Sequence, residues 1–321
     1  MLKKFTAVLL AAIMLICTFS GCAGVESASS DKLKIVCTVF PYYDWVRNLI
    51  KDVDNAEVIL LLNTGTDLHS YQPTAEDIIT ISTADIFVYT GGTSDSWVTD
   101  VLKTSKNEKA KLINLCEVLG EEKLCCVEAI GDESHSHEEE DGHTHTHDEH
   151  IWLSVRNAIT LTNVISDALC EKNPENKDTY EKNRIEYTDK LSALDKKYES
   201  TLAATAKNTL VFADRFPFIY LTTDYSLSYA AAFSGCSAES EASFETVTAL
   251  AEKIDEVGLS YILITETSDG SVANTVKNST KSKNQEILVL NAMQSITKSD
   301  IGTGYIEIME SNLKVLEKAL S

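Results

Sequence analysis

The sequence is short of basic residues and of closely paired cysteines. It contains 28 Lys and Arg against 49 Asp and Glu, a formal net charge of −21. An acidic surface repels phosphates, so nucleic acid is not an expected partner, whereas cations are drawn toward such a surface. Ordinary solubility explains the charge equally well. The eight cysteines include no CxxC pair, so their spacing leaves both disulfides and buried free thiols open.

A bilayer-spanning apolar run is also missing. The run from Phe5 to Phe19 has roughly 15 residues, and a span needs about 20. With two lysines before it, this run predicts an export signal over residues 1–21, the alternative being a permanent transmembrane anchor. The small residues before Cys22 resemble the lipobox of bacterial lipoproteins, which implies a lipid-modified Cys22 held by acyl chains. Residues 22–31 are then expected to form a flexible tether.

The remainder of the chain predicts an α/β fold in two lobes. Its length suggests two domains, and short apolar runs alternate with amphipathic stretches in both halves, which is βαβ spacing. We assign residues 32–173 to the first lobe and 207–321 to the second. The expected strands are Leu33–Val39, Ala56–Leu62, Ile86–Thr90 and Lys111–Leu115, then Thr209–Ala213, Leu227–Phe233, Tyr261–Thr265 and Ile287–Leu290.

A stretch without glycine or proline separates the two lobes. Residues 175–206 are charged and amphipathic throughout, so they predict a helix of about 30 residues, near 45 Å long. An element of that length is better suited to connecting two lobes than to lying inside one. We therefore assign residues 174–206 to one long, rigid linking helix.

Histidine is absent after position 150, and most histidines lie in one polar segment. Residues 133–149 contain no aliphatic side chain, so this segment is expected to be a solvated loop of the first lobe. Imidazole is a common zinc ligand that is largely neutral at pH 7, so the segment predicts loose binding of several zinc ions. The alternative is low complexity without function. The loop histidines are His135, His137, His143, His145 and His147.

The other two histidines need separate consideration. His69 follows the expected strand Ala56–Leu62 by a turn, and ligands bind beyond the carboxyl ends of strands in open α/β sheets. His150 lies where the polar loop rejoins an apolar segment. Either side chain could instead have a purely structural role.

Two segments around these histidines resemble one family. Residues 65–73, GTDLHSYQP, resemble the G-[TS]-D-P-H-x-[YF]-E-P segment of zinc and manganese solute-binding proteins of ABC importers, the cluster A-I family. Residues 148–154, DEHIWLS, resemble that family's D-P-H-x-W-L-[SD] segment. The resemblance implies that His69 and His150 are metal ligands, that the fold is of the periplasmic-binding-protein type, and that the His-rich loop belongs to a zinc-specific member.

The sequence departs from this family at the third ligand. Family members usually place His or Glu after the first strand of the second domain, where residues 211–218 read VFADRFPF. Asp214 is the candidate ligand, although it could equally cap a helix or pair with its neighbour. A one-residue shift would place Arg215 there, and a guanidinium has no free lone pair. Glu266 and Gln294 are candidates for a further ligand or, more in keeping with their positions, for supporting residues.

The resemblance implies a zinc-binding component of an ABC importer. Such a chain would act as a monomer on the extracytoplasmic face of the membrane, hold Zn²⁺ as its transported ligand in an interlobe cleft, and pass it to the permease and its ATPase. Three alternatives remain: a manganese-binding homologue, a zinc-dependent hydrolase and a surface metal buffer. The sequence has no HExxH motif, which argues against an enzyme.

Overall fold

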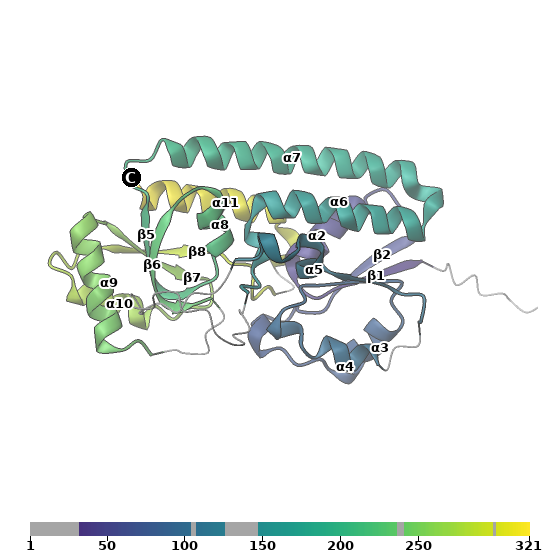
Figure 1. The fold of residues 1–321 in the computed structure, drawn as a ribbon, viewed down its shortest axis with the longest axis horizontal. Coiled ribbons are helices and arrows are strands. Elements are labelled where there is room, and N and C mark those ends of the chain that lie inside the picture. The colour runs from purple at the N-terminus through teal and green to yellow at the C-terminus, as the bar shows by residue number, and fades with distance from the viewer. Residues whose placement is uncertain (1–31, 104–106, 126–146, 236–240, 298–299) are drawn as a thin grey trace, which may run out of the picture. The chain divides into compact units, whose positions relative to one another are not determined.

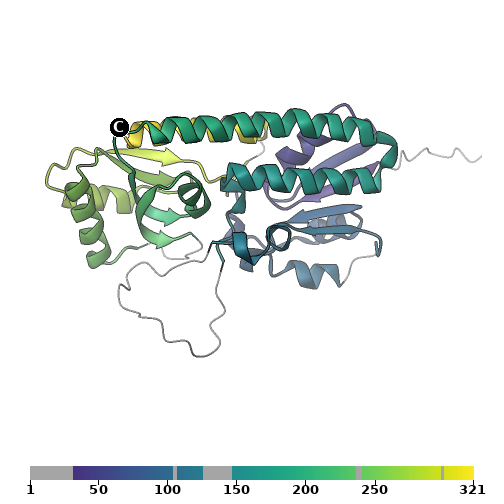
Figure 2. The same ribbon diagram turned by 45° about the horizontal axis from the view of Figure 1, so that its top comes forward.

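The computed structural model describes residues 32–103, 107–125, 147–235, 241–297 and 300–321. Residues Leu33–Ser321 form one compact unit. This unit contains two four-stranded sheets, and all strand pairs within them are parallel. Figures 1 and 2 show helices packed around each sheet. The expected fold of two parallel-sheet α/β lobes with a long helix is confirmed.

The first sheet has the strand order β2-β1-β3-β4. Its central strands are almost continuously apolar and buried, as expected of parallel strands covered on both faces. Thr74 and Asp77 form a capping box at the start of α3. The elements are β1 (Leu33–Cys37), α2 (Phe40–Leu49), β2 (Ala56–Leu60), α3 (Ala75–Ser82), β3 (Ile86–Tyr89), α4 (Val98–Leu102), β4 (Lys111–Asn114) and α5 (Leu115–Leu119).

The second sheet has the equivalent order, β6-β5-β7-β8. Strand β5 is irregular, because its register against β6 shifts between Phe212 and Arg215. A bulge of this kind changes the direction in which the following side chains point. The elements are β5 (Thr209–Phe216), α8 (Ile219–Asp224), β6 (Ser228–Ser234), α9 (Phe244–Val257), β7 (Tyr261–Thr265), α10 (Ser271–Ser279), β8 (Glu286–Leu290) and α11 (Tyr305–Ala319).

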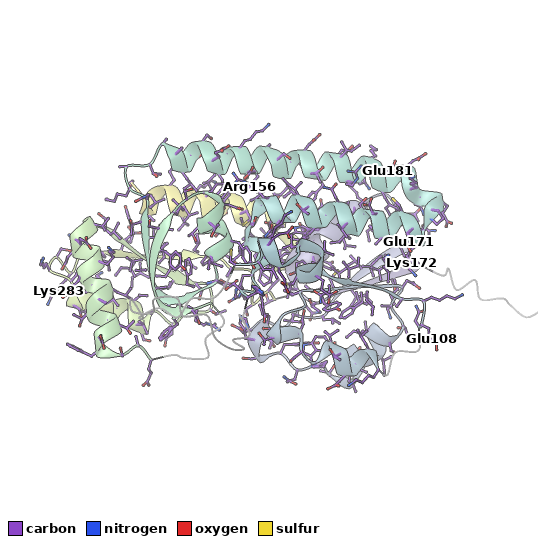
Figure 3. The ribbon with its side chains drawn as sticks, viewed as in Figure 1. Glu108, Arg156, Glu171, Lys172, Glu181 and Lys283 are labelled. Carbon is purple, nitrogen blue, oxygen red and sulfur yellow. The ribbon has the colours of Figure 1, made fainter. Side chains whose placement is uncertain are left out.

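Two long helices connect the sheets, α6 (Val155–Lys172) and α7 (Lys177–Ala203). The 27 residues of α7 are about 40 Å long at 1.5 Å per residue. Helix α7 packs against α6, α2 and α11 (Figure 1). Arg156 of α6, labelled in Figure 3, donates from Nε to Asp195 of α7 at 3.1 Å. The side chain of Asn183 donates to Leu49 O of α2, and Tyr198 Oη donates to Met309 O of α11.

The apolar core runs through both lobes. One cluster of buried side chains extends from β1 through α6 and α7 to α11, and a smaller one lies between β5, β7, α9 and α10. Because close-packed interiors resist deformation, this continuity favours small relative movements of the lobes. Among the described residues, no helix combines the length and apolarity that a bilayer span requires. Short 3₁₀ helices complete the fold: η1 (Leu68–Ser70), η2 (Thr93–Asp95), η3 (Glu121–Lys123), η4 (Ile151–Leu153), η5 (Pro174–Asn176) and η6 (Asp300–Gly302).

Candidate metal centre

His69 is presented by a short turn beyond the carboxyl end of β2. Asp67 caps η1, and its Oδ1 accepts a hydrogen bond from the backbone N–H of His69 at 2.9 Å. The Nδ1 atom of the ring lies 2.7 Å from Ser94 Oγ, which belongs to the loop after β3. A hydroxyl can donate or accept, so Ser94 is compatible with either neutral tautomer of His69.

His150 is completely buried and held more firmly. Asp148 Oδ1 accepts hydrogen bonds from both the backbone N–H and Nδ1 of His150, at 2.8 and 2.9 Å. A carboxylate only accepts, so Nδ1 carries a proton, and in the neutral ring the lone pair is then on Nε2. This carboxylate–histidine arrangement is the one that orients imidazole ligands in metal sites.

The two imidazole rings meet through their Nε2 atoms, which lie 3.2 Å apart. Two nitrogens bound to one tetrahedral zinc at 2.0 to 2.1 Å would be about 3.3 Å apart. Burial, and after it the neighbouring His150, lower the pKa of His69 to about 4. His69 is therefore neutral at pH 7, and the pair offers nitrogen ligands at the spacing that zinc requires.

The loop after β3 supports this pair. Glu149 accepts hydrogen bonds from Ser94 N at 3.0 Å and from the hydroxyl of Thr93. A Cβ atom at Gly92 would lie 2.3 Å from the Glu149 side chain, so only glycine permits this approach. Glu149 thus fixes the loop whose Ser94 contacts His69. The sequence did not identify either residue as functional, and only the position of Glu149 beside His150 could have indicated it.

A segment after β8 reaches both histidine-bearing loops. The side-chain amide of Gln294 contacts His150 Nε2. Trp152 Nε1 donates to Ala292 O at 2.9 Å, and Gly65 N donates to Ile296 O at 3.1 Å. Gln294, a candidate from the sequence, is therefore brought to the histidine pair.

Glu266 lies behind this segment. Its two carboxylate oxygens accept hydrogen bonds from Ala292 N at 2.8 Å and from Gln294 N at 3.0 Å. Burial raises the pKa of Glu266 above its usual value, although these bonds oppose the shift. Both oxygens hold the backbone that carries Gln294, which is a supporting role.

Asp214 is not brought to the histidines. Its Oδ2 accepts hydrogen bonds from N and Oγ1 of Thr265 on β7, at 2.8 and 2.6 Å, and its Oδ1 accepts one from Arg215 N at 2.8 Å. Arg215 instead reaches the first lobe, where its Nη2 donates to Asp67 Oδ2 at 2.8 Å. The reason is the bulge in β5, which turns Asp214 toward the neighbouring strand and Arg215 toward the loop of His69.

Other candidate residues lie elsewhere. Cys22 and the loop histidines His135, His137, His143 and His145 are outside the described residues. His147 is described and half-buried, next to Asp148. Across the described ranges, no group of three or more His, Cys, Asp or Glu side chains is arranged to hold a metal ion. The centre therefore consists of two imidazoles and one amide.

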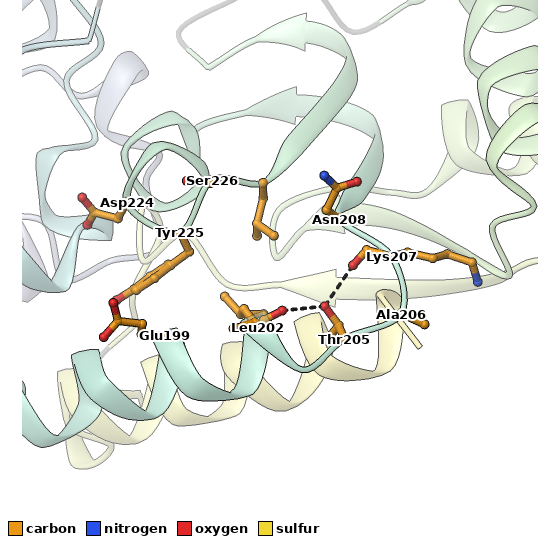
Figure 4. Close-up of a pocket in the computed structure, with 11 residues that line it drawn as sticks. Glu199, Leu202, Thr205, Ala206, Lys207, Asn208, Asp224, Tyr225 and Ser226 are labelled. Atoms are coloured by element: carbon orange, nitrogen blue, oxygen red, sulfur yellow. Dashed lines mark hydrogen bonds between the residues drawn. The ribbon is translucent and has the colours of Figure 1, made fainter.

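A surface pocket of about 470 Å³ lies at the connection between α7 and β5 (Figure 4). It is lined by Glu199 and Leu202 of α7, by Asp224 at the end of α8 and by Tyr225 after it. None of the residues predicted to bind metal lines this pocket. It contains no histidine or cysteine, so its carboxylates lack the nitrogen or sulfur partners that zinc prefers.

The family model for "Zinc-uptake complex component A periplasmic" matches residues 35–319. The high-affinity zinc uptake system protein ZnuA of Bacillus subtilis is 30% identical over 332 residues, covering 100% of this chain and 99% of that protein. The zinc-binding lipoprotein AdcA of Streptococcus pneumoniae is 35% identical over 299 residues, covering 91% of this chain. This chain spans only 57% of the length of that AdcA.

A solved structure shares the fold. The crystal structure of the Zn(II)-bound ZnuA-like domain of Streptococcus pneumoniae AdcA has a TM-score of 0.70 and 33% identity, covering 90% of this chain and 99% of that one. The match of the family model over nearly the whole described chain agrees with the paired histidines between two parallel-sheet lobes. The chain belongs to the family of zinc-uptake complex component A periplasmic proteins.

Proposed function

We propose that this chain is the extracytoplasmic zinc-binding component of an ABC importer. It captures Zn²⁺ between its lobes on His69 and His150 and delivers the ion to the permease, whose ATPase drives import. The observation that carries the proposal is the 3.2 Å separation of the two Nε2 atoms, one edge of a tetrahedral zinc site. The printed names of the relatives, zinc-binding lipoprotein and zinc uptake system protein, support the same ligand.

Zinc fits this donor set better than manganese. Imidazole suits zinc, whereas manganese prefers carboxylate, carbonyl and water oxygens. The nearby carboxylates of Asp148 and Glu149 are occupied by hydrogen bonds to His150 and to the Ser94 loop. The pair therefore offers nitrogen where manganese would need oxygen.

The proposal includes the anchor and the division of the chain. Residues 1–21 are removed, a lipid on Cys22 holds the monomer to the membrane, and residues 22–31 are the tether. The first lobe, the linking helix and the second lobe keep the bounds 32–173, 174–206 and 207–321. The positions of the two sheets and of α7 support that division.

A hydrolase would use similar zinc ligands but needs a free base near the metal. Each carboxylate around the histidines accepts hydrogen bonds from the protein, so none stands ready to activate a water molecule. We therefore propose a binding protein rather than an enzyme. An assay of zinc-loaded protein on ester and peptide substrates should detect no turnover.

Zinc and manganese titration of the soluble chain from residue 23 onward tests the proposal. We expect one tight zinc site, weaker manganese binding, and additional loose zinc sites. Deleting residues 133–147 should remove the loose sites and leave the tight one. The double variant His69→Ala/His150→Ala should lose the tight site while the loop sites remain. Tight zinc binding that survives in the double variant would refute the proposed centre.

A further inference from the structure

Arg215 places a cation beside the two histidines. Its Nη2 donates to Asp67 Oδ2 at 2.8 Å and lies 3.4 Å from Thr267 Oγ1. Asp67 also caps the turn that carries His69. Asp67 thus links the guanidinium of Arg215 to His69, a proposed zinc ligand. The charge of Arg215 is also among the causes that lower the pKa of His69.

The carboxylates around the centre are already used. Asp148 is bonded to His150, and Asp67 to the His69 turn and to Arg215. Glu149 accepts a hydrogen bond from Ser94 N. Glu266 accepts from Ala292 N and Gln294 N, and Asp214 accepts from Thr265 N. The described chain therefore offers a metal two imidazoles and an amide.

This set is incomplete for zinc. A zinc site has four ligands as a rule, and a divalent cation near a partly buried guanidinium is electrostatically unfavourable unless an anion lies between them. Arg215 has donors for such an anion. Its side chain is 20% exposed, and within the described ranges Nε and Nη1 donate to no protein acceptor. A carboxylate forms strong, charge-assisted hydrogen bonds with a guanidinium.

We propose that zinc is held here together with a small carboxylate-bearing co-ligand. The co-ligand's carboxylate binds Nε or Nη1 of Arg215, and its donor atoms complete the coordination of a zinc ion held by His69 and His150. This inference rests on the proposed zinc-binding function. It makes Arg215 a specificity-determining residue that selects a zinc–carboxylate complex over the bare ion.

Equilibrium dialysis of radiolabelled citrate against the soluble chain lacking residues 133–147 tests the inference. We expect citrate to be retained only when zinc is present, at one molecule per protein. Malonate and L-histidine, each with fewer carboxylates, serve as further labelled probes. Arg215→Gln should weaken citrate retention about 10-fold or more, the usual value of a charged hydrogen bond, while zinc alone binds as well as before or better.

Asp67→Asn is the matched control for a structural role. It removes the ion pair of Arg215 but keeps an oxygen that can accept from His69 N. Asp67 also caps the turn of His69, so the two variants are compared at zinc concentrations that saturate each of them. If Arg215 recognises a carboxylate, zinc-saturated Asp67→Asn should retain citrate, because its Arg215 guanidinium is released from the ion pair. If both variants lose citrate equally, the Arg215–Asp67 pair only joins the lobes and the inference is overturned.

The two proposals fail in different ways. If zinc binds tightly but citrate, malonate and L-histidine only strip it from the protein, the co-ligand inference fails and zinc binding stands. If zinc itself does not bind at His69 and His150, the proposed function fails and the inference fails with it.

Discussion

The two sides of the proposed metal centre use their carboxylates differently. In the first lobe, Asp148 fixes the tautomer of His150, and Glu149 fixes the loop beside His69, so carboxylates prepare nitrogen ligands. In the second lobe, Asp214 and Glu266 accept hydrogen bonds from the backbone of that lobe and not from the histidine-bearing segments. One lobe thus presents ligands, while the other presents an amide and a guanidinium.

This difference indicates a division of labour between the lobes. Affinity for the metal should depend on the first lobe, where lone pairs are oriented in advance and little ordering is needed on binding. The second lobe should influence which complex is accepted, because Gln294 contacts His150 and Arg215 pairs with Asp67 beside His69, and neither supplies a charge that attracts zinc. Variants on the two sides should therefore differ in the kind of effect, and not only in its size.

The largest effect is expected from His150→Ala. It removes the proposed ligand, whose ring is oriented by Asp148, and even the loss of a supporting residue costs about 10- to 100-fold in metal affinity. We expect zinc affinity to fall by more than about 100-fold, measured by competition with a chromophoric chelator.

His147→Ala is the control for that variant, because it removes a histidine three positions away that lies in the polar loop. It should leave the tight affinity unchanged. Circular dichroism of both variants checks the fold, since His150→Ala also leaves Asp148 buried without its partner. Equal losses in the two variants would contradict the assignment of His150.

Asp95 extends the comparison to a buried carboxylate that holds the backbone before Ser94. It accepts hydrogen bonds from Thr90 N and Gly91 N in the loop before Ser94. Burial, opposed by these bonds, raises its pKa from 3.8 to about 6. Because the folded chain holds this proton more tightly than the unfolded chain, protonation of Asp95 stabilises the folded state. This contribution to the unfolding free energy is complete below about pH 3.8 and is lost as pH rises through 6.

We therefore expect the wild-type chain to lose roughly 2 to 3 kcal/mol of unfolding free energy between pH 4 and pH 7, relative to Asp95→Asn. Urea denaturation of both proteins at several pH values measures the difference. Parallel pH curves for the two proteins would show that Asp95 titrates normally.

A smaller loss of zinc affinity is expected from Asp148→Asn. The amide can still contact the ring of His150, but it no longer fixes one tautomer, so part of the population presents N–H to the metal. We expect a loss of about 10- to 100-fold, with the fold retained. The effect should be absent from a His150→Ala background, because Asp148 is expected to affect zinc only by orienting the His150 ring. Additive losses would mean that Asp148 binds zinc directly.

Much of the fold was predictable because its signals are local. Apolar runs of four to eight residues locate all eight described strands within a few positions, and Thr74 with Asp77 gives the start of α3. The short helix α8 (Ile219–Asp224) was missed, because six residues are too few to establish a helical period.

The metal centre was only partly predictable. His69 and His150 stand in recognisable segments, and the structure brings their rings together. Ser94 has no sequence signal, because its role depends on a loop that tertiary contacts with Glu149 bring near. The choice between Asp214 and Arg215 depends on a bulge in β5. A register shift of one residue exchanges the faces of neighbouring side chains, and sequence alone does not reveal it.

Asp214→Ala tests whether Asp214 is a metal ligand, as the sequence predicts, or a structural residue of the second lobe, as its contacts indicate. The described contacts place the carboxylate on Thr265 and Arg215 N, so its removal should lower the unfolding free energy by about 1 to 3 kcal/mol. Zinc affinity should then stay close to that of the wild-type chain, measured by the same chelator competition at a temperature where both proteins are folded. A loss comparable to that of Asp148→Asn would mean that the lobes rearrange around the ion and bring Asp214 to it, and the contrast between the two sides of the centre would hold only for the metal-free chain.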